Sequence, residues 1–495
     1  MFTLTDLLAD LAPGVRVEDA DNVRIRRACV DSREAGEGTL FAALAGEHTD
    51  GHRYLEAACR AGAVVALAER VPPLEGALST ATVIDLVHLP CGGAACRAST
   101  GPVLLIVPNV LQALQRLAQG RRQARSDLRV VAVTGSVGKT TTKETIAAVL
   151  ATVQPVLRSQ GNQNNEIGLP LTLLALDATQ RYAVLEMGMY SLGEIAALCA
   201  IAAPQIGVVT NVGPVHLERL GTIERIAQAK AELVQALPPD GVAVLNGDDP
   251  RVAAMRSQTR AHVVTFGRQP GNTVWAEGIR VQGLAGTCFS VHVAACPEVG
   301  LAAGECELTT AALGEQVVMS ALPAVALGRM AGLDWPDIQR GLTSQGRGLR
   351  LVPVAGLRGS TLLDDSYNAS PASTCAALRV LGNTSATQAL NRRRIAALGD
   401  MLELGDYEEQ GHREVGRCAA DNVDMLITVG RRARALADEA GRAGLPAEQI
   451  HVLDDTRGAI ALLSDEIATG DVILIKGSHS IGMGAIVEAL KERQP

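Results

Sequence analysis

A strand, a tight turn and a helix follow one another without a break in LRVVAVTGSVGKTTTKETIAAVLATV, residues 128–153. The opening apolar run is typical of a buried strand, and the closing stretch has helical spacing. Backbone N–H groups of a tight turn, together with a helix N-terminus, attract an anion. The segment therefore predicts an α/β sheet with a phosphate-binding loop where a parallel strand ends.

The turn is a variant of the phosphate loop G-x-x-x-x-G-K-[ST]. Val133 stands where the first glycine belongs, and Gly135 supplies flexibility three residues before Gly138. We expect Lys139 to reach the β- and γ-phosphates of ATP or GTP, and the Thr140 hydroxyl to bind Mg²⁺. The predicted nucleotide-binding residues of the loop are Thr134, Gly135, Ser136, Val137, Gly138, Lys139, Thr140 and Thr141. An ordinary strand-to-helix turn is the alternative, which the Lys-Thr pair disfavours.

Three blocks divide the 495 residues, a length that needs more than one hydrophobic core. We expect a small mixed α/β domain over residues 1–107, with a loop insertion near 86–102. Residues 108–345 alternate strands and helices around the phosphate loop, which predicts a parallel sheet with an antiparallel extension near 272–320. Residues 346–495 alternate again and predict a Rossmann-like, doubly wound domain. The predicted fold class is thus α/β in three domains, the central one a P-loop ATPase domain.

Charge and composition exclude several classes of protein. A formal net charge of -8 argues against nucleic-acid binding through a broad basic face. The start, MFTLTDLLADLAPG, lacks a basic region and a long apolar run, and no stretch reaches the ~18 apolar residues of a membrane span. We therefore expect a cytoplasmic protein that does not insert into membranes. The ten cysteines include no C-x-x-C, so a zinc site at Cys91 and Cys96 is disfavoured.

Two titratable residues follow neighbouring predicted strands of the central block. Glu186 ends the strand YAVLEMG, and His216 lies just beyond the strand IGVVTNV. Since the carboxyl ends of parallel strands open onto one crevice, both side chains are candidates for a metal site beside the phosphates. A solvated carboxylate and a packed or surface histidine are the ordinary alternatives.

Lys230 occupies an unexpected position in the helical segment TIERIAQAKAELVQAL. It lies four residues after Ile226 and three before Leu233, which places it on the same inward face. Burying an isolated ammonium is costly, so the lysine either snorkels to water or has a partner. A lysine converted by CO₂ to a carbamate would carry negative charge and bind Mg²⁺.

The third block contains LLDDSYNASP directly after a predicted strand. Asp364 and Asp365 lie at the strand end, while Tyr367 and Asn368 offer a stacking ring and an amide. A turn rich in Asp, Asn, Ser and Pro also satisfies ordinary loop chemistry, so both interpretations stay open.

These motifs occur in an order that resembles the Mur ligase family, over nearly the whole chain. The matching segments are VDSREAGEGTLFAALAGEHTDGH, TGSVGKTTTKE, GNQNNEIGLPLTLL, LLDDSYNASPAS, ALGDMLELG and LIKGS. The chain most resembles those members that join D-alanyl-D-alanine to UDP-N-acetylmuramoyl-tripeptide. The resemblance implies an ADP-forming ligase that works through an acyl phosphate in peptidoglycan precursor synthesis. It also implies a monomer whose partners are these two small molecules.

The resemblance further implies roles for individual residues. Lys139, Glu186, His216 and Lys230 would be catalytic, and Thr140, Glu186, His216 and a carbamylated Lys230 would contact two Mg²⁺ ions. Further ATP contacts would be Arg347, Asp365, Tyr367 and Asn368. The first domain would bind the UDP-linked substrate, and the implied contacts are Ser32, Arg33, Gly46, Asp50, His52, Asn164 and Asn165. The third domain would contribute to nucleotide and D-alanyl-D-alanine binding.

Three positions depart from the family pattern. The family's adenine-contacting asparagine, in a helix start resembling H-N-x-x-N-A-L-A, would fall in EQVVMSALPA, where Gln316 and Ser320 stand instead, and His479 stands where arginine is expected. The arginine that opens the third domain could be Arg347 or Arg350. These departures concern nucleotide affinity more than the type of reaction.

Other functions remain as alternatives. A sister ligase that adds a single amino acid is the nearest, although the D-N-P-R stretch expected of a tripeptide-forming enzyme is missing. A folylpolyglutamate synthase would leave the DSR…DGH region without a role. A P-loop ATPase that switches partners would not need the first and third blocks. A non-catalytic relative acting as a binding module is disfavoured by the retained Lys139, Glu186, His216 and Lys230.

Overall fold

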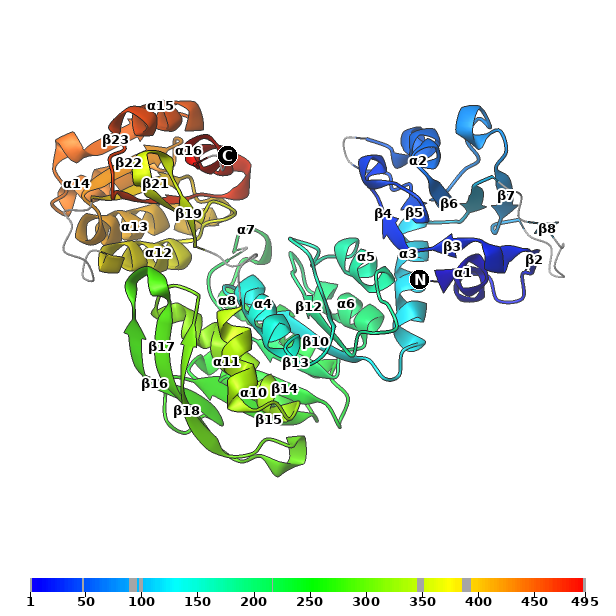
Figure 1. The fold of residues 1–495 in the computed structure, drawn as a ribbon, viewed down its shortest axis with the longest axis horizontal. Helices are drawn as coiled ribbons and strands as arrows, with labels where there is room; N and C mark the ends of the chain where they lie inside the picture. The colour runs from blue at the N-terminus through cyan, green and yellow to red at the C-terminus, as the bar shows by residue number, and fades with distance from the viewer. Residues whose placement is uncertain are drawn as a thin grey trace. The chain divides into compact units, whose positions relative to one another are not determined.

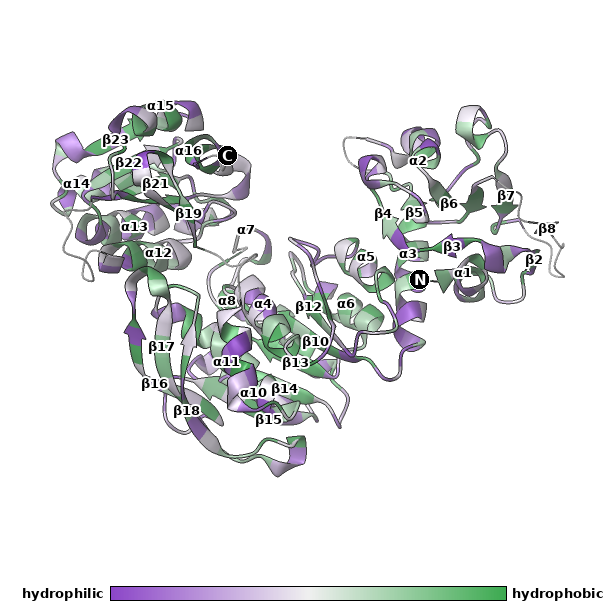
Figure 2. Cartoon of the chain, in the orientation of Figure 1, coloured by the Kyte–Doolittle hydropathy of each residue, from purple (hydrophilic) through white to green (hydrophobic). Residues whose placement is uncertain are grey.

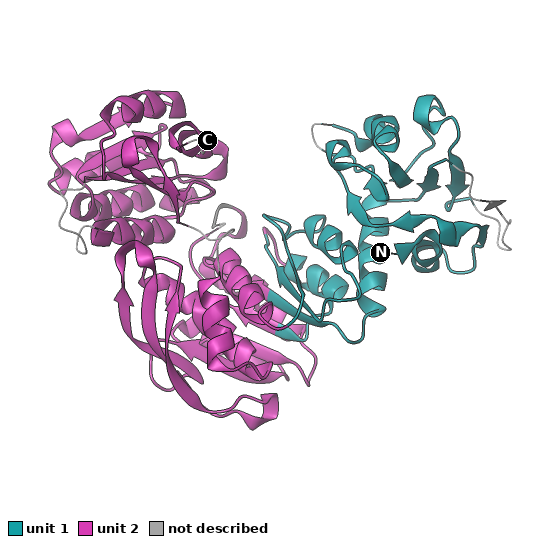
Figure 3. Ribbon diagram, in the orientation of Figure 1, with its two compact units in different colours: residues 1–132, 154–189, 193–206 teal, residues 133–153, 190–192, 207–495 magenta. Residues whose placement is uncertain are grey.

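The structure is a computed structural model, shown in Figure 1. It describes residues 2–46, 49–88, 96–97, 101–215, 217–344, 351–384 and 393–492. The chain divides into two compact units, coloured in Figure 3. The first comprises residues 1–132, 154–189 and 193–206, and the second comprises residues 133–153, 190–192 and 207–495.

The N-terminal part is built on a five-stranded parallel sheet of order β4-β5-β6-β9-β7. Strands β5, β6 and β9 are short and mostly apolar, and β6 is coloured as hydrophobic in Figure 2. The bounds are β4 Arg27–Cys29, β5 Thr39–Ala42, β6 Ala63–Ala68, β7 Thr82–Asp85 and β9 Val103–Ile106. Helices α1 (Leu4–Leu11) and α2 (Leu55–Arg60) complete this part, and α3 (Val110–Gln123) follows it.

A nine-stranded sheet of order β11-β12-β10-β13-β14-β15-β16-β17-β18 forms the central region. The β14–β15 and β15–β16 pairs are parallel, whereas β16, β17 and β18 are antiparallel and lie side by side in Figure 1. This confirms the predicted antiparallel extension. The bounds are β10 Arg129–Thr134, β11 Val156–Arg158, β12 Tyr182–Glu186, β13 Ile206–Val209, β14 Val242–Asn246, β15 His262–Gly267, β16 Val274–Val281, β17 Thr287–Val293 and β18 Gly304–Thr310.

The helices of this region follow the predicted alternation. Their bounds are α4 Lys139–Leu150, α5 Gly168–Leu174, α6 Glu194–Ala202, α7 Leu217–Leu220, α8 Ile223–Gln235, α9 Pro250–Ala254, α10 Val318–Met330 and α11 Trp335–Thr343. The far end of α4 is packed tightly by α10 and α11. A Cβ on Gly341 would lie 2.5 Å from the Val149 Cα, and one on Gly328 would lie 2.9 Å from the Val149 Cγ1. Only glycine fits at these two contacts.

The C-terminal part has a six-stranded sheet of order β19-β20-β24-β21-β22-β23. Among the described residues of this part, only the edge strand β19 pairs antiparallel, so the predicted doubly wound arrangement is confirmed. The strands are β19 Val352–Ala355, β20 Thr361–Asp365, β21 Arg394–Gly399, β22 Met425–Val429, β23 Ile450–Leu453 and β24 Val472–Lys476. The helices are α12 Pro371–Asn383, α13 Glu408–Asn422, α14 Arg434–Arg442, α15 Thr456–Glu466 and α16 Gly484–Leu490.

Two further expectations concern membrane crossing and the 86–102 insertion. Within the described ranges, no helix combines the length and apolar character that a membrane crossing requires. Most of the 86–102 insertion lies outside the described residues. The candidate zinc ligand Cys91 lies outside them as well, and so does the side chain of Cys96.

Candidate active site

The phosphate loop joins β10 to α4, and its backbone requires glycine at two positions. Gly135 has φ +149°, and a Cβ there would lie 1.9 Å from the Thr210 Oγ1. Gly138 has φ +85° and caps α4, whose first residue is Lys139. The turn therefore presents a helix N-terminus next to glycine backbone, the arrangement that binds phosphate.

Residues after β13 hold this loop in place. The Ser136 hydroxyl donates to the Gly213 carbonyl at 3.0 Å, and the Val137 N–H donates to the Asn211 Oδ1 at 2.9 Å. The Thr210 hydroxyl donates to the Val137 carbonyl at 2.8 Å. Thr210 and Asn211 were not among the predicted site residues, although a polar Thr-Asn pair ending an apolar strand was a usable signal.

Lys139 curls over its own loop. Its Nζ donates to the Gly135 carbonyl at 2.8 Å and to the Ser136 carbonyl at 3.3 Å. Thr140 and Thr141 are half-buried in the first turn of α4, whereas Thr134 at the end of β10 is fully buried. The predicted loop residues thus lie together, with the Lys139 amine on the loop backbone.

Lys230 is buried in α8, with only 2% of its surface exposed, which confirms the inward orientation predicted from helical spacing. Burial, and then the charge of nearby Lys139, hold the pKa of the Lys230 amine well below its usual value. Both effects disfavour the charged form, because an ammonium loses its hydration and meets a like charge. The structure therefore places a buried amine with a lowered pKa near Lys139.

Glu186 ends β12 and is 3% exposed. Its Oε1 accepts a hydrogen bond from the Asn164 Nδ2 at 3.0 Å. Its Oε2 is buried and has no hydrogen-bond partner among the described residues. A buried carboxylate oxygen needs compensation, and a divalent cation would supply it.

Asn164 and Asn165, both predicted to touch the UDP-linked substrate, differ in their settings. Asn164 is engaged with the Glu186 carboxylate, so the structure brings together two residues assigned to different ligands. The Asn165 Oδ1 accepts from the Gly168 N–H at 2.9 Å and so supports the start of α5. Neither contact was readable from sequence spacing.

Asp50 and His52 form a closed network in the N-terminal part. The His52 Nδ1 lies 2.6 Å from the Asp50 Oδ1, and the His52 Nε2 accepts from the Glu69 N–H at 2.9 Å. Arg70 contacts the other Asp50 oxygen. Hydrogen bonds from His52, and then from Arg70, lower the pKa of the Asp50 carboxyl. Both nitrogens of the His52 ring are therefore occupied by the chain itself.

The other residues predicted for the UDP-linked substrate lie in turns of the same part. Arg33 is exposed and pairs with Asp31 at 2.5 Å, and Ser32 begins the same short helical turn. The Gly46 N–H donates to the Thr49 carbonyl at 2.8 Å. The Arg33 guanidinium faces solvent, where an anionic substrate group could reach it.

A buried ion pair lies at the end of β20 in the C-terminal part. The Lys476 Nζ contacts the Asp365 Oδ2 at 2.6 Å and donates to the Asn368 carbonyl at 2.8 Å. Among the described residues, the buried Asp365 Oδ1 has no hydrogen-bond partner. Lys476 was not a predicted site residue, although its position at the end of the apolar strand VILIK could have indicated it.

A pocket of about 410 Å³ opens beside this pair. Tyr367 is 42% exposed, and its ring centroid lies 5.2 Å from that of His479. The pocket is lined by Val352, Asp364, Asp365, Ser366, Tyr367, His479, Gly482, Gly484 and Ala485. A carboxylate oxygen with spare acceptor capacity beside an aromatic face suits a ligand that carries hydroxyl groups and a flat ring.

The buried pair gives a first testable expectation. Lys476→Met leaves the Asp365 carboxylate buried without its cation, so the free energy of unfolding should fall by about 3 to 5 kcal/mol. Urea unfolding of the full chain measures this change. The double variant Lys476→Met/Asp365→Asn removes both charges and should recover most of the loss. Equal losses in the single and double variants would contradict the pairing.

Of four further positions named from the sequence, Ser320 belongs to the described residues and three do not. His216, Arg347 and the alternative Arg350 are outside the described residues. Ser320 is buried, and its hydroxyl accepts from the Thr142 hydroxyl at 3.1 Å. No group of three or more His, Cys, Asp or Glu side chains in the described part of the chain is placed to hold a metal.

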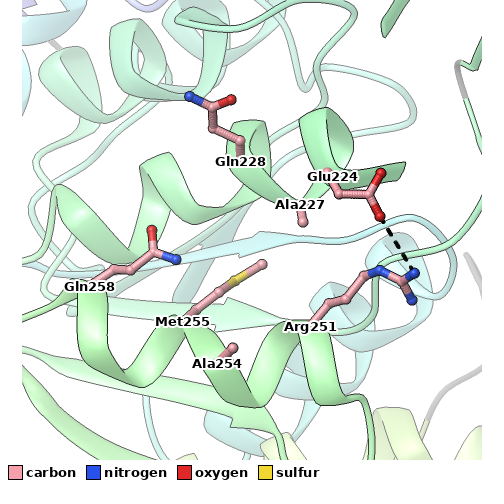
Figure 4. Close-up of a pocket in the computed structure, with 7 residues that line it drawn as sticks. All are labelled: Glu224, Ala227, Gln228, Arg251, Ala254, Met255 and Gln258. Atoms are coloured by element: carbon pink, nitrogen blue, oxygen red, sulfur yellow. Dashed lines mark ion pairs between the residues drawn. The ribbon is translucent and has the colours of Figure 1, made fainter. Parts of the chain in front are cut away.

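A second pocket, of about 290 Å³, lies between α8 and α9 and is shown in Figure 4. Glu224 and Arg251 form an ion pair of 3.8 Å across it, with Met255 at its floor. None of its lining residues belongs to the predicted site, and Lys230 of α8 is buried rather than in the pocket wall. We do not assign the chemistry to this pocket.

Comparison with known proteins identifies the family. Three family models match the chain: "Mur ligase family, catalytic domain" over residues 24–122, "Mur ligase middle domain" over 133–328 and "Mur ligase, glutamate ligase domain" over 349–479. A Mycobacterium tuberculosis UDP-N-acetylmuramoyl-tripeptide–D-alanyl-D-alanine ligase is 36% identical over 98% of this chain and 95% of its own length. The chain belongs to the Mur ligase family. An Escherichia coli ligase of the same name is 32% identical over 98% of this chain and 97% of its own.

Solved structures of Mur ligases agree with this membership. MurF from Acinetobacter baumannii superposes with a TM-score of 0.77 at 29% identity and covers 98% of both chains. MurF ligase from Thermotoga maritima in complex with ADP has a TM-score of 0.71 at 26% identity, over 94% and 97% of the two chains. The predicted α/β class with three Mur ligase domains is thereby confirmed.

Proposed function

We propose that this Mur ligase joins D-alanyl-D-alanine to UDP-N-acetylmuramoyl-tripeptide, with conversion of ATP to ADP and phosphate. Relatives that carry this name match nearly the whole chain, and a relative's structure holds ADP. The structural observation that carries the proposal is the buried Lys230, whose amine has a lowered pKa, near Lys139 of a phosphate loop. A loop that only binds nucleotide would not need a second, desolvated lysine there.

The reaction must overcome the poor leaving group of a carboxylate. Transfer of the γ-phosphoryl group of ATP to the tripeptide carboxylate forms an acyl phosphate and releases ADP. The amine of D-alanyl-D-alanine then attacks the acyl carbon, loses a proton and expels phosphate. Lys139 offsets the repulsion between the carboxylate and the γ-phosphate, and the loop backbone holds the phosphates in line.

Residues of the site suit Mg²⁺. Thr140, Glu186, His216 and the carbamate of Lys230 would hold two ions, which neutralise phosphate charge when bound. The unsatisfied Glu186 Oε2 supports a cation there, and the lowered pKa of the Lys230 amine favours the unprotonated form, which is the form that adds CO₂. Asn164 would orient the Glu186 carboxylate through its hydrogen bond.

We propose substrate sites in the outer domains. Residues 1–107 would bind the UDP-linked substrate through Ser32, Arg33 and Gly46. Asp50 and His52 would hold the backbone of this domain in place through their hydrogen bonds. Residues 108–345 would hold ATP, with further contacts from Arg347, Asp365, Tyr367 and Asn368. Residues 346–495 would also bind D-alanyl-D-alanine. Because ATP and a UDP-linked precursor are consumed, we place the reaction in the cytoplasm, carried out by a monomer.

The deciding experiment measures phosphate release with purified protein, ATP and Mg²⁺. Release should require UDP-N-acetylmuramoyl-tripeptide and D-alanyl-D-alanine together, with each single substrate giving only background. A lone amino acid as acceptor would instead identify a ligase of the sister type. Release without either substrate would identify a P-loop ATPase and sink the proposal.

A further inference from the structure

Helices α12 and α13 of the C-terminal part pack side by side (Figure 1). A Cβ on Gly411 of α13 would lie 2.7 Å from the Pro371 Cγ at the start of α12. A Cβ on Gly382, near the end of α12, would lie 2.2 Å from the Asn422 Oδ1 at the end of α13. The helices therefore run in the same direction, and glycine permits close contact toward both ends.

Two cysteines meet between these contacts. The Cys418 Sγ of α13 lies 3.6 Å from the Cys375 carbonyl oxygen of α12. In return, the Cys375 Sγ lies 4.0 Å from the carbonyl oxygen of Glu414, one turn before Cys418. Each sulfur thus reaches the backbone of the opposite helix, and both residues are only partly buried. The two thiols therefore lie at the same level of the contact between α12 and α13, where a disulfide would join the two helices.

The environment makes the two thiols chemically unequal. A hydrogen bond from Cys375, and then the positive charge of Arg379, lower the pKa of the Cys418 thiol against the opposing effects of burial and Asp421. The same hydrogen bond, together with burial, raises the pKa of the Cys375 thiol. Cys418 is therefore the attacking sulfur and Cys375 the resolving one.

We propose that Cys375 and Cys418 form a redox-active dithiol that closes to an intramolecular disulfide by exchange with a low-molecular-weight organic disulfide. The Cys418 thiolate attacks one sulfur of the small disulfide, forms a mixed disulfide and releases one thiolate. Cys375 then loses its proton and attacks the Cys418 sulfur, which expels the second thiolate. The two protein thiols lose two electrons and two protons, and the small disulfide becomes two thiols.

The position of this pair gives the modification a structural consequence. The disulfide would tie α12 to α13 and close a loop containing β21, which pairs with β24 in the middle of the sheet. Such a covalent loop lowers the conformational entropy of the unfolded chain, so the oxidised protein should melt at a higher temperature than the reduced one. Since α12 begins at Pro371, the tie also fixes the helix that follows the Asp365–Ser370 turn.

The test uses the full chain treated with oxidised glutathione. We expect an intact mass lower by two hydrogens at this pair, a tryptic peptide joining Cys375 to Cys418, and full reversal by dithiothreitol. Cys375→Ser should abolish the cross-link and instead leave glutathione on Cys418. Cys418→Ser should abolish the cross-link as well. Cys306→Ser removes a partly buried cysteine on β18 and should leave the cross-link unchanged.

Two results would overturn the proposal. One is stable glutathione on Cys418 of the unsubstituted chain without any cross-linked peptide. The other is no modification of either cysteine while other cysteines react. Peptide mapping of the unsubstituted chain decides between these outcomes even if a serine variant fails to fold.

Discussion

Replacing Lys230 with methionine should lower the rate of paired-substrate phosphate release by about 1,000-fold, equivalent to about 4 kcal/mol of transition-state stabilisation. Methionine fills a similar volume but cannot form a carbamate. Added bicarbonate should therefore not restore turnover. Lys491→Met removes an exposed lysine amine and should leave the rate unchanged. Largely intact activity in Lys230→Met would disprove the carbamate role.

The same variant should also change how stability depends on pH. The unfolded chain protonates Lys230 below its ordinary pKa of 10.5, whereas burial, and then the charge of Lys139, lower the pKa of the folded amine. Between the two pKa values the unfolded state binds more protons, so the contribution of Lys230 to stability is largest above about pH 10.5 and falls as the pH drops toward the lowered pKa of the folded state. In buffer free of Mg²⁺ and CO₂, Lys230→Met should melt at a higher temperature than the parent at pH 7. A lower melting temperature at that pH would contradict the lowered pKa of the Lys230 amine.

Glu186→Gln should lower turnover by about 100-fold and raise the Mg²⁺ concentration needed for half-maximal rate. Glutamine keeps the shape of the side chain, and its amide oxygen can still accept from Asn164. It removes the negative charge and replaces the unsatisfied Oε2 with an amide nitrogen, which repels a cation. Titration of Mg²⁺ against phosphate release separates this effect from a simple loss of folding.

Glu224→Gln is the matched control, because Glu224 is an exposed carboxylate of α8 whose partner is Arg251. Its Mg²⁺ dependence should equal that of the parent chain. An unchanged Mg²⁺ requirement in Glu186→Gln, with only the rate reduced, would assign Glu186 a structural role instead of a metal contact.

Much of the fold was predictable because it depends on local patterns. Short apolar runs such as YAVLE and VILIK became β12 and β24, and the helical spacing around Lys230 correctly placed its side chain inside. Strand order was less accessible, since it arises from contacts between distant segments. The sequence pattern could suggest parallel units but could not place β24 between β20 and β21.

The sequence predicted which types of residue form the site, but it predicted few of the contacts between them. The glycines and Lys139 follow a known loop pattern, but Asn211 acts through a hydrogen bond to Val137 across 74 positions. His52 had the sequence setting of a ligand contact, and only coordinates reveal that both ring nitrogens are occupied. Such pairings depend on side-chain direction, which no spacing rule provides.

Gly341 packs against Val149 near the end of α4, the helix that begins at the phosphate loop. Val149 lies ten residues after Lys139, which is about 15 Å along a helix. A side chain at Gly341 would push on this distant end, and a stiff helix transmits the shift to the phosphate loop instead of absorbing it. Since misplacement of about 1 Å can cost about 100-fold in rate, a methyl group far from any substrate would behave as an active-site change. Whether a substitution in this chain is tolerated therefore depends on its packing against helices that carry site residues, as well as on its distance from the site.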